Sequence, residues 1–430
     1  MSKPVTGALT ATLAMPGDKS ISHRSLMFAA IANGVSDVQG VLEGEDCLAT
    51  ADAMRALGVP VTSTGKGAYR IDGRGLNGLR APSVALDLGN SGTGMRLMCG
   101  LLAGQPFSTT LIGDASLSTR PMRRVTDPLA QMGADIATDQ GHAPIEIRPS
   151  RALSGIQYTL PVASAQLKSA LLIAGLYANA PVTVTEPAPT RDHTERMLAS
   201  MGAQIERDGG VVRIHPVTQL QPFSITVPCD LSSAAFFMVA ASIVPDSELT
   251  LPGVGVNPTR DGVLHILRDM GADITLGNQR DCSGEPVADL TIRGASLKGV
   301  RVTPDVVPLA IDEFPVLFVA AAVANGTSEF TGLAELRHKE SDRIDAMTRG
   351  LRALGVTLEE GEDWVTIEGG QLQGGVVDSF TDHRIAMAFA VAGAVAKGPV
   401  EVMRPDNIAT SFPDFLSLAK AAGLTLALSE

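Results

Sequence analysis

Several polar side chains suited to binding an anion stand directly before an apolar run near the N-terminus. In the stretch 16–27, PGDKSISHRSLM, these are Lys19, Ser20 and Arg24. Gly17-Asp18 predicts a turn and a helix N-cap, so the three side chains would lie near the first turns of a helix. The positive end of the helix dipole and exposed backbone N–H groups lie there too, which favours a phosphate site. A capped helix with a solvated basic start accounts for this stretch alone equally well.

Other basic residues also stand beside Ser, Thr or Asp at the starts of predicted helices. They are Arg96, Arg120, Arg123, Arg124, Arg191, Lys339, Arg343 and Arg384. Each alone could be a solvated surface charge. Their repeated placement at helix starts instead favours a shared anion site, because the planar fork of Arg matches carboxylate and phosphate.

Two carboxylates, Asp312 and Glu340, lie among these cations. Asp312 is expected to cap a buried helix and Glu340 to begin one, so an N-cap and a helix salt bridge are the structural alternatives. A buried carboxylate near bound anions would have a raised pKa and could act as an acid or a base. The chain has no HExxH, CxxC or GxxxxGK[ST] motif, so we expect neither a metal ion nor a nucleotide.

The composition restricts the partners that the chain can have. It has 430 residues, of which 45% are hydrophobic and 4% aromatic, and a net charge of −12. The length suggests two domains, and the many small residues suggest closely packed helices rather than large aromatic cores. The acidic balance argues against nucleic acid and anionic membranes as partners, so a phosphate site would be a local positive pocket.

The N-terminus and the cysteines indicate a cytoplasmic protein, which we expect to be a monomer. The N-terminus lacks the basic-then-apolar layout of a signal peptide, and no apolar run could span a bilayer. The cysteines are Cys47, Cys99, Cys229 and Cys282. We expect them to be free thiols in a reducing compartment, packed as small apolar side chains.

One pattern recurs along the chain: a polar start, a helix of small apolar residues, Gly or Asn, and a β-branched strand. The copies begin at Gly17, Gly89, Ala163, Cys229, Ile311 and Thr381. Their intervals of roughly 70 residues are too long for a solenoid, so each copy is predicted to be a small subdomain.

An amphipathic helix and a short hairpin are predicted to follow in each copy. The predicted helices are 50–57, 121–132, 193–201, 261–270, 341–354 and 412–422. In the first five, Gly follows the last helical residue, as a left-handed C′ residue requires. The unit is therefore β-α-β-α-β-β. Its first helix is apolar nearly all round and should be buried.

Six such units predict an α/β protein of two domains, each with three units around three buried parallel helices. The polar clusters at the starts of these helices are Lys19-Ser20, Asn90-Ser91, 164–166, 230–232, Asp312-Glu313 and 382–384. If the two domains face each other through these ends, about half a positive charge from each helix dipole gathers in one cleft. We expect that cleft to attract a ligand with several negative charges.

Taken together, these motifs resemble those of the 5-enolpyruvylshikimate-3-phosphate (EPSP) synthase family. The motifs are GDKSISHR, LGNSGTGMR, STRPM, SAQLKSALLIAGL, TRDHTERML, DEFPVLFVAAA, HKESDRI and TDHRIAMA. They run nearly end to end and keep the family's order. The resemblance implies an inside-out α/β barrel with residues 1–17 plus 228–430 in one domain, 18–227 in the other, and the active site between them.

The resemblance also implies an activity. The enolpyruvyl group of phosphoenolpyruvate would be transferred to the 5-hydroxyl of shikimate 3-phosphate, through a tetrahedral intermediate and with release of phosphate. This step of the shikimate pathway leads to chorismate and the aromatic amino acids, and it needs no cofactor or metal. Asp312 would be the base, and Glu340 would protonate the methylene carbon, with Lys19 as the other candidate for that proton.

The implied substrate ligands divide into two overlapping groups. Those of shikimate 3-phosphate would be Lys19, Ser20, Arg24, Ser164, Gln166, Arg191, Asp312 and Lys339. Those of phosphoenolpyruvate would be Lys19, Gly92, Arg120, Gln166, Arg343 and Arg384.

The chain departs from many members of the family in two places. Ala165 stands where many have a second Ser, and Thr410 and Ser411 occupy the region where many have a Lys. One phosphoenolpyruvate contact is therefore missing or is replaced by the arginines. Some members that resist glyphosate carry a methyl group at the position of Gly92, so we expect this chain to be sensitive.

Two alternatives remain open. The UDP-N-acetylglucosamine enolpyruvyl transferases share the fold and the donor and carry a reactive Cys, occasionally Asp, before a donor-binding Arg. This chain has Asp114 in that stretch and no Cys, although GDKSISHR and TRDHTER argue against this family. A non-catalytic binder of phosphorylated metabolites is the other alternative, and the presence of both Asp312 and Glu340 argues against it.

Overall fold

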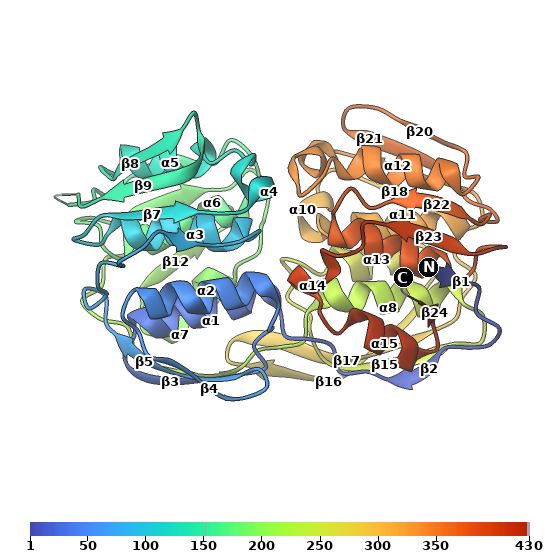
Figure 1. Ribbon diagram of the computed structural model, residues 1–430, viewed down its shortest axis with the longest axis horizontal. Coiled ribbons are helices and arrows are strands. Elements are labelled where there is room, and N and C mark those ends of the chain that lie inside the picture. The colour runs from blue at the N-terminus through green and yellow to red at the C-terminus, as the bar shows by residue number, and fades with distance from the viewer. Residues whose placement is uncertain (151, 428–430) are drawn as a thin grey trace. The chain divides into compact units, whose positions relative to one another are not determined.

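The structure is a computed structural model that describes residues 1–150 and 152–427 (Figure 1). These residues form two compact units. Unit 1 comprises Met1–Pro16, Pro228–Asp281 and the chain from Pro286 onward, and unit 2 comprises Gly17–Val227 with Cys282–Glu285. We expected Cys282–Glu285 in the same domain as the residues on either side of them, but they group with unit 2.

Each sheet in the described residues has four strands, with a parallel pair at one edge. In unit 2 the strand orders are β14-β3-β5-β4, β6-β7-β9-β8 and β10-β11-β13-β12, and in unit 1 they are β2-β15-β17-β16, β18-β19-β21-β20 and β22-β23-β1-β24. The first two strands of every sheet run parallel. A buried helix precedes the second strand, as a parallel connection requires.

The elements of unit 2 follow the predicted repeat three times. The first repeat has α1 (Lys19–Ile31), β3 (Asn33–Gln39), α2 (Glu45–Ala56), β4 (Val61–Gly65) and β5 (Ala68–Arg74), and its sheet also takes in β14 (Ser224–Thr226). The second has β6 (Leu86–Asp87), α3 (Gly92–Ala103), β7 (Thr109–Ile112), α4 (Ala115–Ser118), α5 (Arg123–Gln131), β8 (Asp135–Asp139) and β9 (His142–Arg148). The third has β10 (Gln157–Thr159), α6 (Ala165–Gly175), β11 (Val182–Thr185), α7 (His193–Ser200), β12 (Ile205–Asp208) and β13 (Val211–Ile214).

The elements of unit 1 follow the same repeat. The fourth copy has β2 (Thr10–Thr12), α8 (Leu231–Ile243), β15 (Glu248–Gly255), α9 (Gly262–Asp269), β16 (Asp273–Cys282) and β17 (Glu285–Arg293). The fifth has β18 (Arg301–Val302), α10 (Val307–Ala310), α11 (Phe314–Val323), β19 (Thr327–Thr331), the 3₁₀ helix η1 (Ala334–His338), α12 (Arg343–Ala353), β20 (Leu358–Glu360) and β21 (Trp364–Glu368). The sixth has β22 (Gly375–Asp378), α13 (His383–Ala392), β23 (Val400–Met403), α14 (Ile408–Ser411), α15 (Phe415–Ala422) and β24 (Thr425–Leu426), completed by β1 (Ser2–Lys3).

Three repeats take a strand from a distant part of the chain. Strand β14 pairs with β3, β2 pairs with β15, and β1 lies between β23 and β24. Each of these strands has only two or three residues. Segments this short carry no readable alternation, so the sequence did not predict them.

The predicted burial of the first helix in each repeat is confirmed. Nearly every residue of α1, α3, α6, α8, α11 and α13 is buried. In unit 1, α8, α11 and α13 pack against one another (Figure 1). In unit 2, α3 and α6 approach so closely that a Cβ on Gly100 would lie 2.2 Å from the carbonyl oxygen of Ala170. Glycine is therefore required at this crossing.

The first five amphipathic helices end before a glycine, as predicted, but some of the predicted first residues are wrong. Gly58, Gly133, Gly202, Gly271 and Gly355 follow them with φ between 83° and 96°. The first of these helices, α2, starts at Glu45 rather than at residue 50, because Glu45 and Asp46 favour the positive end of the helix dipole. The last predicted helix, 412–422, corresponds to α15, which begins at Phe415, two residues after Pro413; the short helix α14 ends at Ser411, just before the predicted range.

The expected absence of aromatic cores does not hold in unit 1. Phe236, Phe237, Phe412 and Phe415 form one cluster, with ring centroids 5.6–6.2 Å apart. Phe314, Phe318 and Phe330 form another, at 5.0–5.9 Å. The few aromatic residues are thus concentrated in one of the two cores.

Two further expectations concern the cysteines and the membrane. All four cysteines are free, as predicted, and Cys47 and Cys99 are buried. In the part of the chain that the structure describes, no helix is long and apolar enough to cross a membrane.

Candidate active site

The start of α1 carries the basic residues predicted to bind phosphate. Asp18 is the N-cap, as predicted, and its carboxylate accepts a hydrogen bond from the backbone N–H of Ile21 at 2.8 Å. Lys19 is the first helical residue, and its ammonium forms an ion pair with the nearly buried carboxylate of Asp46 on α2. Ser20 is partly exposed beside it. The cation at this helix start is thus held by the next helix of the same repeat.

Arg24 lies one turn further along α1 and is only 2% exposed. Its Nε donates to Thr194 Oγ1 at 2.7 Å, its Nη2 to Ser169 Oγ at 2.7 Å and its Nη1 to the carbonyl of Ser20 at 2.9 Å. Burial lowers the pKa of Arg24 to about 10, a change that nearby Glu195 opposes. The guanidinium therefore stays charged near neutral pH and joins α1 to α6 and α7.

His23 joins the start of α1 to the start of α3. Its Nδ1 lies 2.8 Å from Thr50 Oγ1 and its Nε2 lies 3.4 Å from Ser91 Oγ. Burial, and then the charges of Lys19 and Arg24, hold the pKa of His23 well below its usual value of 6.5. The imidazole is therefore neutral near pH 7 and serves as a hydrogen-bonding link.

Two arginines converge on the start of α3. A Cβ added to Gly92 would lie 2.9 Å from Arg120 Nη1 and 3.3 Å from Arg96 Nη1. Arg120 donates to Asn90 Oδ1 at 2.7 Å, and Arg96 donates to Gln166 Oε1 at 2.6 Å. The structure thus brings together Gly92, Arg120 and Gln166, which sequence motifs had assigned to one substrate. The structure also places Arg96 and Asn90 in this group, although the motifs had assigned neither residue to a substrate.

The remaining predicted residues of unit 2 stand at the starts of α6 and α7. Ser164 is the N-cap of α6 and accepts a hydrogen bond from Leu167 N at 3.3 Å. Arg191 is partly exposed and comes directly before Asp192, the N-cap of α7. Because α6 and α7 both contact Arg24, the residues assigned to shikimate 3-phosphate in this unit lie on connected helix starts.

In unit 1, a buried arginine gathers three carboxylates. The side chain of Arg343 is 1% exposed. Its Nε donates to Asp382 Oδ2 at 2.8 Å, its Nη2 donates to Glu340 Oε2 at 2.6 Å, and its Nη1 lies 3.4 Å from Asp312 Oδ1. Burial alone would lower the pKa of Arg343, but the carboxylates of Asp382, Glu340 and Asp312 raise it. Arg343 therefore fixes both predicted proton-transfer groups from one side.

Contacts with neighbouring cations position Asp312, which does not cap a helix. The N-cap of α11 is Glu313, so the predicted capping role of Asp312 is wrong. Lys339 Nζ lies 3.4 Å from Asp312 Oδ1, and Arg384 donates to the Asp312 carbonyl at 3.0 Å. The Asp312 side chain keeps 17% of its surface exposed and that of Glu340 keeps 23%, so both carboxylates are open to a substrate.

A second network involves Glu313, the residue after Asp312. Arg260 donates to Asp230 Oδ1 at 2.9 Å and to Ser232 Oγ at 2.7 Å. Ser232 in turn donates to the buried carboxylate of Glu313, and Arg384 Nη1 lies 3.9 Å from that carboxylate. The starts of α8 and α11 are thus linked by charge-assisted hydrogen bonds, and an ion pair joins the start of α13 to them.

Asp114 and Thr410, whose roles the sequence left open, both make local hydrogen bonds. Asp114, the possible counterpart of a reactive residue, is the N-cap of α4 and accepts hydrogen bonds from Leu117 N and Asn90 Nδ2, each at 2.7 Å. Thr410, which stands near the missing Lys, is buried on α14 and donates to the Asn407 carbonyl at 2.7 Å. Both side chains are occupied in local structure.

Comparison with known proteins supplies the family. The family model described as EPSP synthase (3-phosphoshikimate 1-carboxyvinyltransferase) matches residues 4–418. The chain belongs to the EPSP synthase family. The 3-phosphoshikimate 1-carboxyvinyltransferase of Acidithiobacillus ferrooxidans is 56% identical over 97% of this chain and 96% of its own length. The protein of the same name from Methylococcus capsulatus is 55% identical over 98% of this chain and 97% of its own.

The solved structures agree with this assignment. A structure of EPSP synthase from Acinetobacter baumannii is 49% identical to this chain, covers 100% of it and 99% of its own chain, and superposes with a TM-score of 0.90. The expected two-domain inside-out α/β fold of the EPSP synthase family is therefore confirmed.

Arg343 makes a testable contribution to stability. We predict that Arg343→Met lowers the free energy of unfolding by about 3–5 kcal/mol at pH 7, because it leaves the carboxylate of Asp382, with 0% of its side chain exposed, buried without its counter-charge. Urea denaturation measures this difference. The matched control is Arg349→Met on the same helix, whose side chain is 63% exposed; it should cost at most about 1 kcal/mol.

The cost of Arg343→Met should also depend on pH. Burial alone would raise the pKa of Asp382, but Arg343 holds it below the usual 3.8 in the folded protein. The stability that this carboxylate contributes is therefore present above about pH 4 and is lost as the pH falls through its lowered pKa. In Arg343→Met the same burial raises the pKa, so the difference between variant and wild type should shrink as the pH falls from 7 toward 4. A difference that grows on acidification would contradict the role given to Asp382.

Proposed function

We propose that this chain transfers the enolpyruvyl group of phosphoenolpyruvate to the 5-hydroxyl of shikimate 3-phosphate and releases phosphate, the reaction of its family. The observation that carries the proposal is the pair of carboxylates, Asp312 and Glu340, held by the buried cation Arg343. A protein that only binds phosphorylated metabolites needs cations but has no use for an acid–base pair. We propose that groups of both units take part.

In the first half of the reaction, the 5-hydroxyl oxygen bonds to C2 of phosphoenolpyruvate. Asp312 accepts the hydroxyl proton, and Glu340 gives a proton to C3, so that a tetrahedral intermediate forms. Elimination then breaks the bond between C2 and the phosphate oxygen, while the proton returns from C3 to the enzyme. Each proton-transfer group is expected to contribute roughly 10²–10⁴ in rate.

The cations have a separate task in this mechanism. Arg24 and Arg191, with Ser20, Ser164 and Gln166, would bind shikimate 3-phosphate, and Lys339 would do so beside Asp312. Arg120, Arg343 and Arg384, with the backbone at Gly92, would bind phosphoenolpyruvate. Lys19, now paired with Asp46, would contact both substrates. Holding the two substrates together supplies a large proximity term.

The arginines also account for the missing Lys near the C-terminus. Thr410 and Ser411 are neutral, and Thr410 is bonded to its own helix, so neither supplies a charge. We propose that Arg120 and Arg384 pair with the charge of the donor substrate without it, because the charge of Arg343 is already paired with three carboxylates.

We further propose that the protein works as a monomer in the cytoplasm. Four free thiols suit a reducing compartment. The relatives named above are bacterial enzymes that match nearly the whole chain.

Phosphate release from phosphoenolpyruvate tests the proposed function. Shikimate 3-phosphate and UDP-N-acetylglucosamine should be supplied separately as acceptors, with Asp312→Ala alongside the wild type. We expect release only with shikimate 3-phosphate, and at least about 100-fold less of it in Asp312→Ala, because the variant lacks the base. Release only with the sugar nucleotide would assign the other enolpyruvyl transferase activity. Binding of shikimate 3-phosphate without release would favour a binding protein.

The space at Gly92 yields a prediction about inhibitor sensitivity. We expect the wild type to be inhibited by glyphosate in competition with phosphoenolpyruvate. In Gly92→Ala the new methyl group would displace the end of Arg120, which lies 2.9 Å from its position. Losing one bond to a charged group costs about 1.5–3 kcal/mol, so the KM for phosphoenolpyruvate should rise about tenfold or more, and inhibition should weaken.

Steady-state kinetics with each substrate varied in turn measure this effect. Gly370→Ala is the control, because a Cβ there meets nothing within 4 Å. An unchanged KM for phosphoenolpyruvate in Gly92→Ala would show that Arg120 does not bind the donor substrate.

A further inference from the structure

The tip of the β16–β17 hairpin places a buried carboxylate inside unit 2. Cys282–Glu285 group with this unit, although Asp281 and Pro286 on either side of them belong to unit 1. The Glu285 carboxylate is 1% exposed, and its Oε1 lies 2.7 Å from Nδ1 of His193, which is equally buried. Burying a charge is costly unless it is paired, so this contact calls for an explanation.

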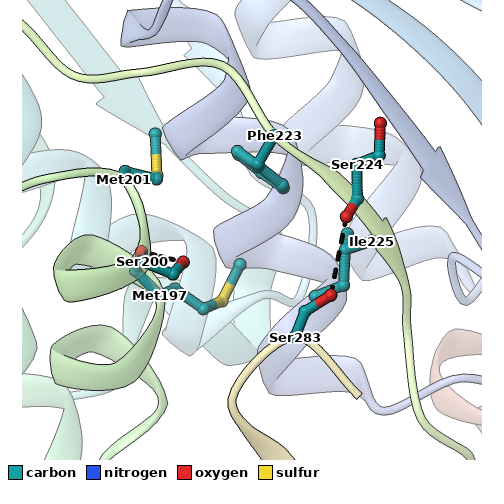
Figure 2. A pocket seen from close by; sticks show the side chains of 7 residues that line it. All are labelled: Met197, Ser200, Met201, Phe223, Ser224, Ile225 and Ser283. Carbon is teal, nitrogen blue, oxygen red and sulfur yellow. Dashed lines mark hydrogen bonds between the residues drawn. The ribbon is translucent and has the colours of Figure 1, made fainter.

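The hairpin tip is held mainly by polar contacts. Arg196 donates to the Gly284 carbonyl at 2.8 Å, and Ser283 Oγ lies 3.5 Å from the Ser224 carbonyl. Figure 2 shows Ser283 opposite Met197 of α7, across a cavity of about 240 Å³. Because this side of the tip borders a cavity and not a close-packed core, the contact between Glu285 and His193 and the hydrogen bond from Arg196 fix the position of the tip.

His193 begins the helical turn that reaches Arg24. It is the first residue of α7 and is followed by Thr194 and Glu195. Thr194 Oγ1 accepts a hydrogen bond from Arg24 Nε at 2.7 Å and donates to Ser169 Oγ at 2.8 Å. These side chains are all buried. A shift at the start of α7 is therefore transmitted directly to the guanidinium of Arg24.

We propose that Glu285 is a positioning residue for the shikimate 3-phosphate site. By holding His193 it fixes the first turn of α7, and through Thr194 it fixes Arg24. Its charge also favours the cationic form of Arg24, whose pKa burial lowers and Glu285 helps to raise. The inference rests on the proposed function, in which Arg24 and Arg191 bind this substrate.

The same residues do not form a convincing cation site. Potential ligand atoms of Asp192, His193 and Glu285 lie within 4.8 Å of one another. However, Asp192 accepts from Arg196 at 2.8 Å and from Arg207 at 2.7 Å, and Glu285 is paired with His193. Since two arginines pair with Asp192 and the His193 imidazole bonds to Glu285, we interpret the cluster as a network of ion pairs and hydrogen bonds.

The test uses Glu285→Ala and Glu285→Gln in the full chain, with Asp281→Asn as control. The control removes the same charge from an exposed position four residues earlier on the hairpin. We expect the dissociation constant of shikimate 3-phosphate, measured by titration calorimetry, to rise on the order of tenfold in Glu285→Ala. Its KM should rise in parallel, while the KM for phosphoenolpyruvate changes less than about threefold. Glu285→Gln, which keeps the shape and one hydrogen bond, should give a smaller rise, and Asp281→Asn none.

The outcomes separate this inference from the proposed function. A wild type that does not turn over the two substrates would overturn the proposed function. Wild-type turnover with unchanged shikimate 3-phosphate binding in both Glu285 variants would overturn the inference alone, as would equal rises in both KM values. If Glu285→Ala does not fold, as judged by thermal melting, Glu285→Gln decides between these results.

Discussion

The ion pairs of Arg343 are the interaction on which the site in unit 1 depends. A guanidinium with 1% of its side chain exposed would be strongly unfavourable without counter-charges. Asp382, with 0% exposed, supplies a fixed one, and it also caps α13. Asp312 and Glu340 supply the others and remain partly exposed, at 17% and 23%. Arg343 is thus anchored on its buried side and presents two carboxylates on the other, which is the arrangement that proton transfer needs.

Unit 2 solves the complementary problem of gathering cations in an acidic protein. Three of these cations have partners within the unit: Lys19 has Asp46, Arg24 has Thr194 and Ser169, and Arg120 has Asn90. These partners come from neighbouring helix starts, so the positions of the cations follow from the packing of the repeats. Because α3 and α6 cross at Gly100 with almost no space between their backbones, the polar starts of these helices stay close together. The small residues of the buried helices therefore serve the site as well as the core.

Much of this arrangement could be predicted from the sequence. The repeats, the buried helices, the C′ glycines and the caps at Asp18 and Ser164 all have local signals, and the family motifs carried the candidate residues. The strands β1, β2 and β14 could not be predicted, because two or three residues carry no pattern. Asp312 was wrongly predicted to be an N-cap, since the helix begins one residue later, after Glu313. Glu285 had no signal, and Thr194 stood in the motif TRDHTERML without a predicted role. Their contacts join residues far apart in the sequence, and only the tertiary structure brings Thr194 to Arg24 and Glu285 to His193.

The central claim is that Asp382, acting through Arg343, positions the acid–base pair. A double-mutant cycle of Asp382→Asn and Glu340→Gln on kcat tests it most directly. If Asp382 acts through the arginine that holds Glu340, the two losses should not add, and the coupling energy should be about 1 kcal/mol or more. Losses that add to within about 0.3–0.5 kcal/mol would contradict the account, since Asp382 and Glu340 would then act independently.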